Sequence, residues 1–420
     1  IIPLGENLYA VAGDTLFLVR PSGGATALGN LGASTGHVTI VRNRKMDTPQ
    51  IGIANGGVYY VIENNVISTI DLSPLVNAGE LVSIIVHDGY FVLLFDNGFF
   101  YITSSDEATV IDPLENAAAE SKPDGLIAGA RRGREIMLMG TASTEFWQNT
   151  GSVDFPFERT TTIDVGCYSA GSVQEVLAVS SQGASDAVIW AATNDQGSPA
   201  GVVMLEGYSA RKISNFDLDR KLRVSVPDDL QSQTWTSGGH VFYVISGADW
   251  SYQYDLTTGR WIERQSDGTT RWRVSCASSI GGDVVFGDAY AGLLYKLASD
   301  TYSVDVSVLT VERSIDNGLT YGPAYQIDIG GAEDTMQRFT LLRLGAHRED
   351  GAVFRLTLTN AFVEDGRSVD MTLIPPAVHA YPNRMRFNRM YVDVIPGSSQ
   401  NSNPKGITGW AVDADVIEAT

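Results

Sequence analysis

Short apolar segments recur through the first 310 residues, and this recurrence constrains the fold more than any other feature of the sequence. Seven segments begin about 30 to 55 residues apart, which is the spacing of four-stranded β-propeller blades. They are residues 8–11, 58–61, 90–94, 136–139, 187–190, 241–244 and 284–286. One small sheet cannot bury both faces, whereas radially stacked sheets can. We therefore predict an all-β protein in which residues 1–310 form a β-propeller of six or seven blades. A row of separate β-sandwiches is the alternative.

The pattern changes after about residue 302, where the strand-like segments become longer and alternate between apolar and polar residues. Examples are residues 304–309, 339–344, 353–358 and 390–394. Alternation with a period of two indicates strands with one buried and one solvated face. We predict that residues 311–420 form a separate C-terminal antiparallel β-sandwich or small barrel.

Charge and composition exclude several classes of function. The chain carries 49 acidic and 29 basic residues, a net charge of −20, which argues against a protein that grips phosphates. An acidic wall would instead let DNA slide past. No segment reaches the roughly 18 apolar residues of a membrane helix, so we expect no membrane association. The chain starts with Ile1 and not with Met, so we expect that a segment precedes it.

No pattern of residues indicates catalysis, a cofactor or a metal. The two cysteines, Cys167 and Cys276, form no metal motif or disulfide framework, and the five histidines lack metal-ligand spacing. Residues 314–321 resemble an Asp-box, a turn device of sialidases, but it occurs once. Because sialidases are also β-propellers, the alternative function is a propeller-type glycan-binding or glycoside-hydrolysing protein. The basic residues 131–134 are either a solvated turn or a salt-bridging contact to an acidic neighbouring subunit.

Residues 140–159 are the most distinctive stretch. They suit the end of one strand, a second strand and a turn, followed by a loop with two Phe residues around a Pro, an acid and a base. The loop is either an aromatic corner that fills the core or an ordered anchor for a neighbouring subunit. The candidate interface residues are Glu145, Phe146, Trp147, Asp154, Phe155, Pro156, Phe157 and Arg159.

The same stretch resembles the packaged-DNA stabilisation, or tail-hub, proteins of short-tailed phages. Gly140 is followed in order by S-T-E, an aromatic pair, N-T-G, D-F-P-F and Arg159, as in that family. Further motifs of the family follow the same order, at residues 8–16, 88–91, 117–124, 166–173, 207–214, 239–244 and 254–264. The sequence departs from the family at Lys212, where Arg is usual, and at Ile262, where His is usual. The arm that usually precedes the first hairpin is absent from this sequence.

The resemblance implies a structural virion protein and not an enzyme. Such proteins are made in the host cytoplasm and form a six-fold homo-oligomeric ring in the phage tail, below the portal and its connector ring. The ring extends the DNA channel, retains packaged DNA until genome ejection, and docks the tail needle and the fibres or spikes. DNA passes through it without sequence-specific binding. The resemblance implies no catalytic residue, cofactor or metal.

Overall fold

The computed structural model places the chain in two compact units. It describes residues 1–32, 36–180, 183–194, 196–237, 239–266, 268–297, 307–314, 318–330, 337–347, 353–364, 367–373 and 385–394. Unit 1 comprises Ile1–Trp235, Tyr243–Ala248 and Val274–Lys296, and unit 2 comprises Thr236–Phe242, Asp249–Arg273 and Leu297–Thr420. The domain boundary expected at residue 310 stays a prediction.

Unit 1 contains six antiparallel sheets that follow one another in chain order. The first two are β1 (Ile2–Leu4), β2 (Asn7–Ala12), β3 (Thr15–Val19) and β4 (Ala25–Asn30), then β5 (Thr39–Arg42), β6 (Ile51–Asn55), β7 (Val58–Glu63) and β8 (Val66–Ile70). The next two are β9 (Leu81–His87), β10 (Tyr90–Phe95), β11 (Phe99–Thr103) and β12 (Ile111–Ala118), then β13 (Leu126–Arg132), β14 (Glu135–Gly140), β15 (Thr144–Asn149) and β16 (Phe157–Ile163). The last two are β17 (Gly166–Cys167), β18 (Gln174–Ser180), β19 (Gly183–Thr193), β20 (Pro199–Glu206) and β21 (Ser209–Lys212), then β26 (Val274–Ile280), β27 (Asp283–Asp288) and β28 (Leu294–Lys296).

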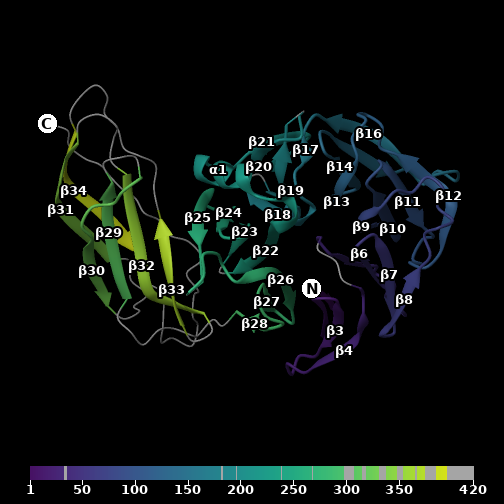
Figure 1. Ribbon diagram of the computed structural model, residues 1–420, viewed down its shortest axis with the longest axis horizontal. Helices are drawn as coiled ribbons and strands as arrows, with labels where there is room; N and C mark the ends of the chain where they lie inside the picture. The colour runs from purple at the N-terminus through teal and green to yellow at the C-terminus, as the bar shows by residue number, and fades with distance from the viewer. Residues whose placement is uncertain are drawn as a thin grey trace. The chain divides into compact units, whose positions relative to one another are not determined.

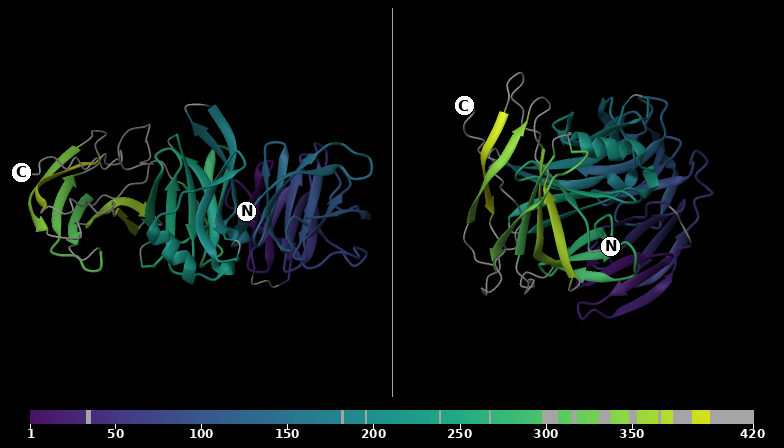
Figure 2. Two further views of the ribbon diagram at one scale, coloured as in Figure 1. Left: turned by 90° about the horizontal axis from the view of Figure 1, so that it is seen from above. Right: turned by 60° about the vertical axis from the view of Figure 1, so that its left-hand side comes forward.

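The apolar segments of the sequence are strands buried on both faces. Strands β6, β10 and β14 are buried along almost their whole length, which explains why these segments are continuously apolar and do not alternate. Separate apolar clusters fill the spaces between the successive sheets from β1–β4 to β17–β21. Figure 1 shows the sheets β5–β8, β9–β12 and β13–β16 following one another along an arc, and the left view of Figure 2 shows their strands running in one general direction.

Strands near the start of each sheet lie against one another. Strand β5 contacts β9, β9 contacts β13, and β13 contacts β18. Strand β26 of the last sheet contacts β1 of the first. Together with the sheet β22 (Gln231–Ser237), β23 (His240–Ser246), β24 (Ser251–Asp255) and β25 (Arg260–Arg264), the described chain has seven successive groups of strands. The fold is therefore the predicted all-β architecture with a β-propeller.

Besides β24 and β25, unit 2 contains the remaining antiparallel strands of the described chain. They are β29 (Ser307–Ser314), β30 (Tyr325–Gly330), β31 (Gln337–His347), β32 (Val353–Glu364), β33 (Arg367–Leu373) and β34 (Met385–Val394). Strand β25 pairs with β33, the order continues through β32 and β29 to β30, and β31 pairs with β34. The long C-terminal strands were predicted from alternation, and residues 304–306 of the first one lie outside the described residues.

Helical structure is scarce in the described chain. It comprises α1 (Phe216–Val224) and the short 3-10 helices η1 (Ala170–Ser172) and η2 (Pro227–Asp229). The Asn215 side chain accepts a hydrogen bond from the Leu218 amide at 2.9 Å and so caps α1. Among the described residues there is no helix with the length and apolar character that crossing a bilayer would require.

Candidate functional site

The segment 140–159 forms the end of β14, all of β15 and the beginning of β16. Strand β15 pairs with β14 on one side and with β16 on the other. The loop between β15 and β16, residues 150–156, carries the predicted turn and the first part of the D-F-P-F motif. The expected arrangement of two adjacent strands followed by a loop is therefore present, and a third strand begins at Phe157.

Glu145 is the centre of a buried cluster in this segment. Its side chain is only 2 % exposed and accepts hydrogen bonds from the Ser121 amide at 2.6 Å and the Trp147 indole at 2.8 Å. The guanidinium of Arg159 lies 3.2 Å from the same carboxylate. Three of the predicted site residues, Glu145, Trp147 and Arg159, are therefore brought together. We call them, with Ser121, the Glu145 cluster.

A second carboxylate fixes the turn between β14 and β15. Asp124 accepts hydrogen bonds from the backbone amides of Ala142 and Ser143, at 2.7 and 2.9 Å, and from the Ser143 hydroxyl at 3.0 Å. A Cβ atom at Gly140 would collide with the Asp124 carboxylate, so a larger residue there would displace the side chain that fixes this turn. The family motifs at residues 117–124 and S-T-E, well separated in the sequence, are thus parts of one structure.

The aromatic residues of the segment point into unit 1. Phe157 is buried, and Phe155 is partly buried with its ring 5.7 Å from that of Phe100 in an edge-on contact. Phe146 and Pro156 are buried too. Asp154, in contrast, is exposed at the tip of the loop, next to Val153, which is 98 % exposed. The aromatic side chains of the loop therefore pack in the core, and its tip faces outward; an anchor for a neighbouring subunit stays a prediction.

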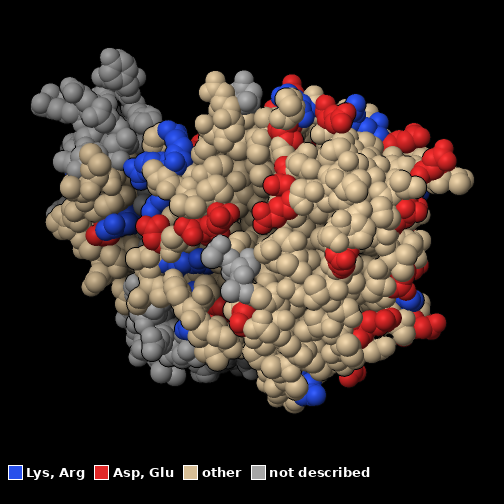
Figure 3. All heavy atoms as spheres, turned by 45° about the vertical axis from the view of Figure 1, so that its right-hand side comes forward, with Lys and Arg blue, Asp and Glu red and all other residues tan. Residues whose placement is uncertain are grey.

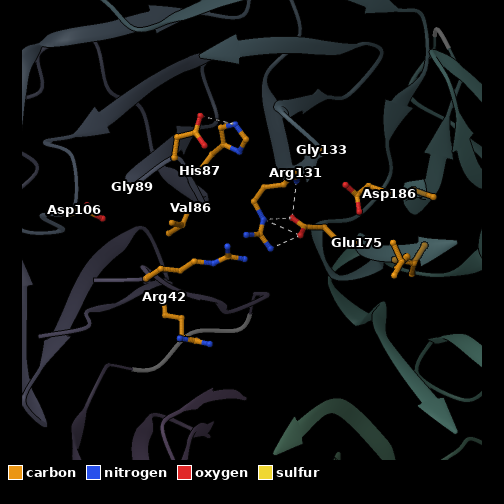
Figure 4. A pocket seen from close by; sticks show the side chains of 14 residues that line it. Arg42, Val86, His87, Gly89, Asp106, Arg131, Gly133, Glu175 and Asp186 are labelled. Carbon is orange, nitrogen blue, oxygen red and sulfur yellow. Dashed lines mark hydrogen bonds and ion pairs between the residues drawn. The ribbon is translucent and has the colours of Figure 1, made fainter. Parts of the chain in front are cut away.

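A further site lies where β5, β9 and β13 end. A cavity of about 460 Å³ is lined there by arginines and carboxylates from four successive sheets (Figure 4). Its charged and titratable lining residues are Arg42, Arg44, His87, Asp88, Asp106, Arg131, Glu175 and Asp186. We call this site the charged cavity. The sequence analysis noted the basic run at 131–134 but did not connect it with the other residues.

Arg131 and Glu175 form the strongest ion pair of the charged cavity. The Arg131 guanidinium donates to both oxygens of Glu175, at 2.7 to 3.2 Å, and the Arg131 amide donates to the same carboxylate at 2.7 Å. The hydrogen bond with Glu175 raises the pKa of Arg131, and the charge of Asp186 adds to this effect. Arg131 is therefore paired within the chain, and the run 131–134 is more than a solvated turn.

His87 and Asp88 form the rim of the charged cavity next to the β15–β16 hairpin. His87 Nε2 lies 3.1 Å from the backbone oxygen of Arg134 and 3.5 Å from the Asp88 carboxylate. Asp88 has a positive φ of 49°, a conformation that few residues other than Gly adopt. The Asn149 side chain donates to Asp88 at 3.2 Å, so the N-T-G turn reaches the rim.

The described residues do not form a metal centre. None of their histidine, cysteine and carboxylate side chains gather in a group of three or more that could hold a metal ion. Cys167 is free and buried, and burial raises the pKa of its thiol to about 12. Within the Asp-box-like segment, residues 315–317 lie outside the described residues, and the Gly318 amide donates to the Ser314 hydroxyl at 2.8 Å.

The fold and the sequence motifs together define a β-propeller protein of phage origin. The model of the family described as bacteriophage P22 Gp10, β-propeller, matches residues 5–302, more than half of the chain. The chain therefore belongs to this family, and the resemblance to phage packaged-DNA stabilisation proteins is confirmed. Its role is that of a phage structural protein in DNA stabilisation.

Comparisons with individual proteins give only remote similarities. No curated protein matches the chain. Among solved structures, the computationally designed protein Ika8 is 11 % identical, with a TM-score of 0.38, over 69 % of this chain and 81 % of that one. PorZ of the type-IX secretion system of Porphyromonas gingivalis is 10 % identical, with a TM-score of 0.42, over 88 % and 44 %. BamB from Moraxella catarrhalis is 13 % identical, with a TM-score of 0.35, over 90 % and 98 %. At these values the similarities support no conclusion about function.

Proposed function

We propose that the protein is a tail-hub or head-completion ring protein of a short-tailed phage. In this proposal six copies form a ring that extends the DNA channel below the portal, retains packaged DNA and docks the distal tail components. The match of the P22 Gp10 family over residues 5–302 carries the proposal. The work of such a protein is mechanical, so we propose no catalytic step and no cofactor.

The charge of the chain supports a channel through which DNA passes without being gripped. The net charge is −20, and on the right-hand part of the face in Figure 3 red Asp and Glu side chains are more frequent than blue Lys and Arg side chains. Tight binding to DNA requires clustered Lys and Arg, because released counterions supply most of the binding free energy. An acidic surface facing the channel would repel DNA and keep it mobile.

We propose the tip of the β15–β16 loop as one contact between neighbouring subunits. The tip, residues 151–154, is exposed and carries Val153 and Asp154. The Glu145 cluster and the packing of Phe155 and Phe157 hold both ends of this loop in place. A rigid loop with an exposed apolar residue is well suited to a heterologous contact, in which each subunit inserts one surface into a different surface of the next.

Light scattering and negative-stain imaging test the proposal. The purified chain is measured alone and mixed with the cognate portal–connector complex. We expect a hollow six-fold ring in at least one sample. A chain that stays monomeric and ignores the portal complex would contradict the proposed function.

The variant Val153→Asp tests the contact. We expect it to reduce ring formation with an unchanged melting temperature, because Val153 packs against nothing within its own subunit. The matched control is Val76→Asp, which places the same charge at another exposed valine. Equal ring formation by Val153→Asp, Val76→Asp and the parent chain would remove the loop tip from the interface and leave the proposed function intact.

A further inference from the structure

We propose that the charged cavity binds a sugar-sized anion. Its phosphate or carboxylate group would lie on Arg42 and Arg44, and its hydroxyl groups would donate to Asp106 and Asp186. This inference goes beyond the proposed function and does not depend on it, because it concerns a site within one chain.

Arg42 and Arg44 provide the anion-binding groups. Both are exposed residues that line the cavity, and neither side chain forms a hydrogen bond or ion pair with any other described residue. A guanidinium has five N–H donors in a fixed planar arrangement that matches carboxylate and phosphate oxygens. Two such groups in one cavity therefore offer a binding surface for an oxyanion.

The residue between the two arginines holds their segment of the backbone in place. Asn43 is fully buried, its backbone amide donates to the Gln50 carbonyl at 3.1 Å, and its side-chain oxygen accepts from the Gln50 amide at 2.8 Å. These hydrogen bonds hold the backbone between Arg42 and Arg44, which both line the cavity, before any ligand binds. A backbone that is already fixed reduces the entropy lost on binding.

Arg131 does not contribute to this surface in the same way. Its donors already face Glu175, and the dashed lines in Figure 4 join the Arg131 guanidinium to the Glu175 carboxylate. The anion therefore belongs near Arg42 and Arg44, and not at the paired Arg131.

The carboxylates of the cavity determine what the rest of the ligand must be. The side chains of Asp106 and Asp186 accept no hydrogen bond from other described residues, whereas Asp88 already accepts one from Asn149. Free carboxylates repel a bare anion but are good acceptors for hydroxyl groups. A volume of about 460 Å³ lies in the usual range for small-molecule sites. An acidic sugar combines both requirements, and its anionic group is a phosphate or a carboxylate.

Isothermal titration calorimetry on the whole chain tests the proposal with four probes. Glucose 6-phosphate and glucuronate carry the two kinds of anionic group, inorganic phosphate lacks the hydroxyls, and glucose lacks the charge. We expect one site per chain for at least one acidic sugar, affinity at least tenfold lower for inorganic phosphate, and no binding of glucose. Binding of only one of the acidic sugars would identify the anionic group. No saturable binding of either would overturn the proposal.

Two double variants and one single variant locate the site. Arg42→Gln with Arg44→Gln should lower the affinity at least tenfold, whereas Arg220→Gln with Arg223→Gln on α1 removes the same charge elsewhere and should not. Glu175→Gln should raise the affinity, because it frees the Arg131 guanidinium for the ligand. Equal losses in the two double variants, or weaker binding by Glu175→Gln, would contradict the assignment. Melting temperatures establish that each variant is folded.

Discussion

The Glu145 cluster and the charged cavity use the same kinds of side chain in opposite ways. Glu145 is buried, and its carboxylate accepts from Ser121, Trp147 and Arg159. Arg42 and Arg44 are exposed at a cavity and have no partner among the described residues. A buried charge must be satisfied within the fold, whereas a cavity can leave charges for something outside. The difference separates residues that stabilise the protein from residues available for binding.

Two residues adjacent in the sequence, of which only Asp106 is among the lining residues of the cavity, show the same contrast. Glu107 accepts hydrogen bonds from Gln50 at 2.7 Å and Thr109 at 2.9 Å, and lies 3.3 Å from the ammonium of Lys45. Asp106, one position earlier, lines the cavity without such partners in the described chain. Of these two adjacent carboxylates, Glu107 stabilises the fold and Asp106 is available to the cavity. The amino-acid composition alone could not distinguish them.

The largest effect is expected at Phe157, which is one of the residues that stabilise the fold. Phe157→Ala should lower the free energy of unfolding by about 4 kcal/mol, because it removes a buried ring and leaves a cavity among Tyr90, Trp147 and Phe155. Denaturant unfolding measures this, with Val153→Ala as the exposed control, for which we expect a change within about 0.5 kcal/mol. If Phe157→Ala changed the free energy of unfolding only slightly but prevented assembly, Phe157 would lie at an interface between subunits and not in the core.

Glu145→Ala should have the next largest effect. It leaves the Ser121 amide and the Trp147 indole without an acceptor, and we expect a loss of about 3 kcal/mol in the free energy of unfolding. The control is Glu158→Ala, which removes an exposed acid from the adjoining strand and should have little effect. Similar stabilities for the two variants would mean that the Glu145 cluster does not stabilise the fold.

A smaller and pH-dependent effect is expected at Glu107. The hydrogen bond from Gln50, with weaker contributions from Thr109 and Lys45, lowers the pKa of Glu107 below its usual value of 4.5. A group whose pKa is lower in the folded state stabilises the protein above the unfolded pKa, and this stabilisation is lost as the pH falls through the folded pKa.

Urea unfolding at a series of pH values measures this contribution. Glu107→Gln should cost less than about 1 kcal/mol at pH 7, because the site is partly solvated, and should make the decline in stability below pH 4.5 shallower. Lys45→Met should act in the same direction more weakly, since Lys45 is a lesser cause of the shift. An unchanged pH profile for both variants would show that the interaction is screened by solvent.

The smallest effect on stability is expected in the charged cavity. Arg42→Gln with Arg44→Gln should change the free energy of unfolding by no more than about 0.5 kcal/mol, because neither side chain has a partner within the described residues. Thermal unfolding in a buffer without phosphate or carboxylates measures this. A loss above about 1 kcal/mol would contradict the contrast with the Glu145 cluster, because it would show that these two arginines also stabilise the fold.

Much of the architecture follows from local sequence signals. The seven apolar segments all lie in strands, such as β2, β10 and β14, because strands buried on both faces must be continuously apolar. The motif at residues 254–264 contains turn residues such as Asp255, whose carboxylate accepts the Thr257 amide and the Thr258 hydroxyl, each at 2.8 Å. These signals span a few residues, so they can be read without knowledge of the tertiary structure.

The candidate site was predicted only in part. The sequence singled out Glu145, Trp147 and Arg159 as members of one motif, and they do form one cluster. It could not show that the Phe residues of the loop face inward while Val153 faces outward, because both directions are compatible with the same loop sequence. It also gave no reason to connect Arg42 with Glu175, since residues so far apart in the chain meet only at the ends of stacked sheets.

The sequence by itself determined the class of fold, the positions of most strands and turns, and membership of a phage structural family. These depend on apolar periodicity, turn residues and ordered motifs, all of which are local or cumulative along the chain. Only the tertiary structure decided which charges are paired. Arg131 meets Glu175, and Glu107 meets Lys45, because neighbouring sheets bring their strand ends and loops together. The same packing leaves Arg42 and Arg44 facing a cavity, and pairing of charges across sheets is set by this packing and not by sequence spacing.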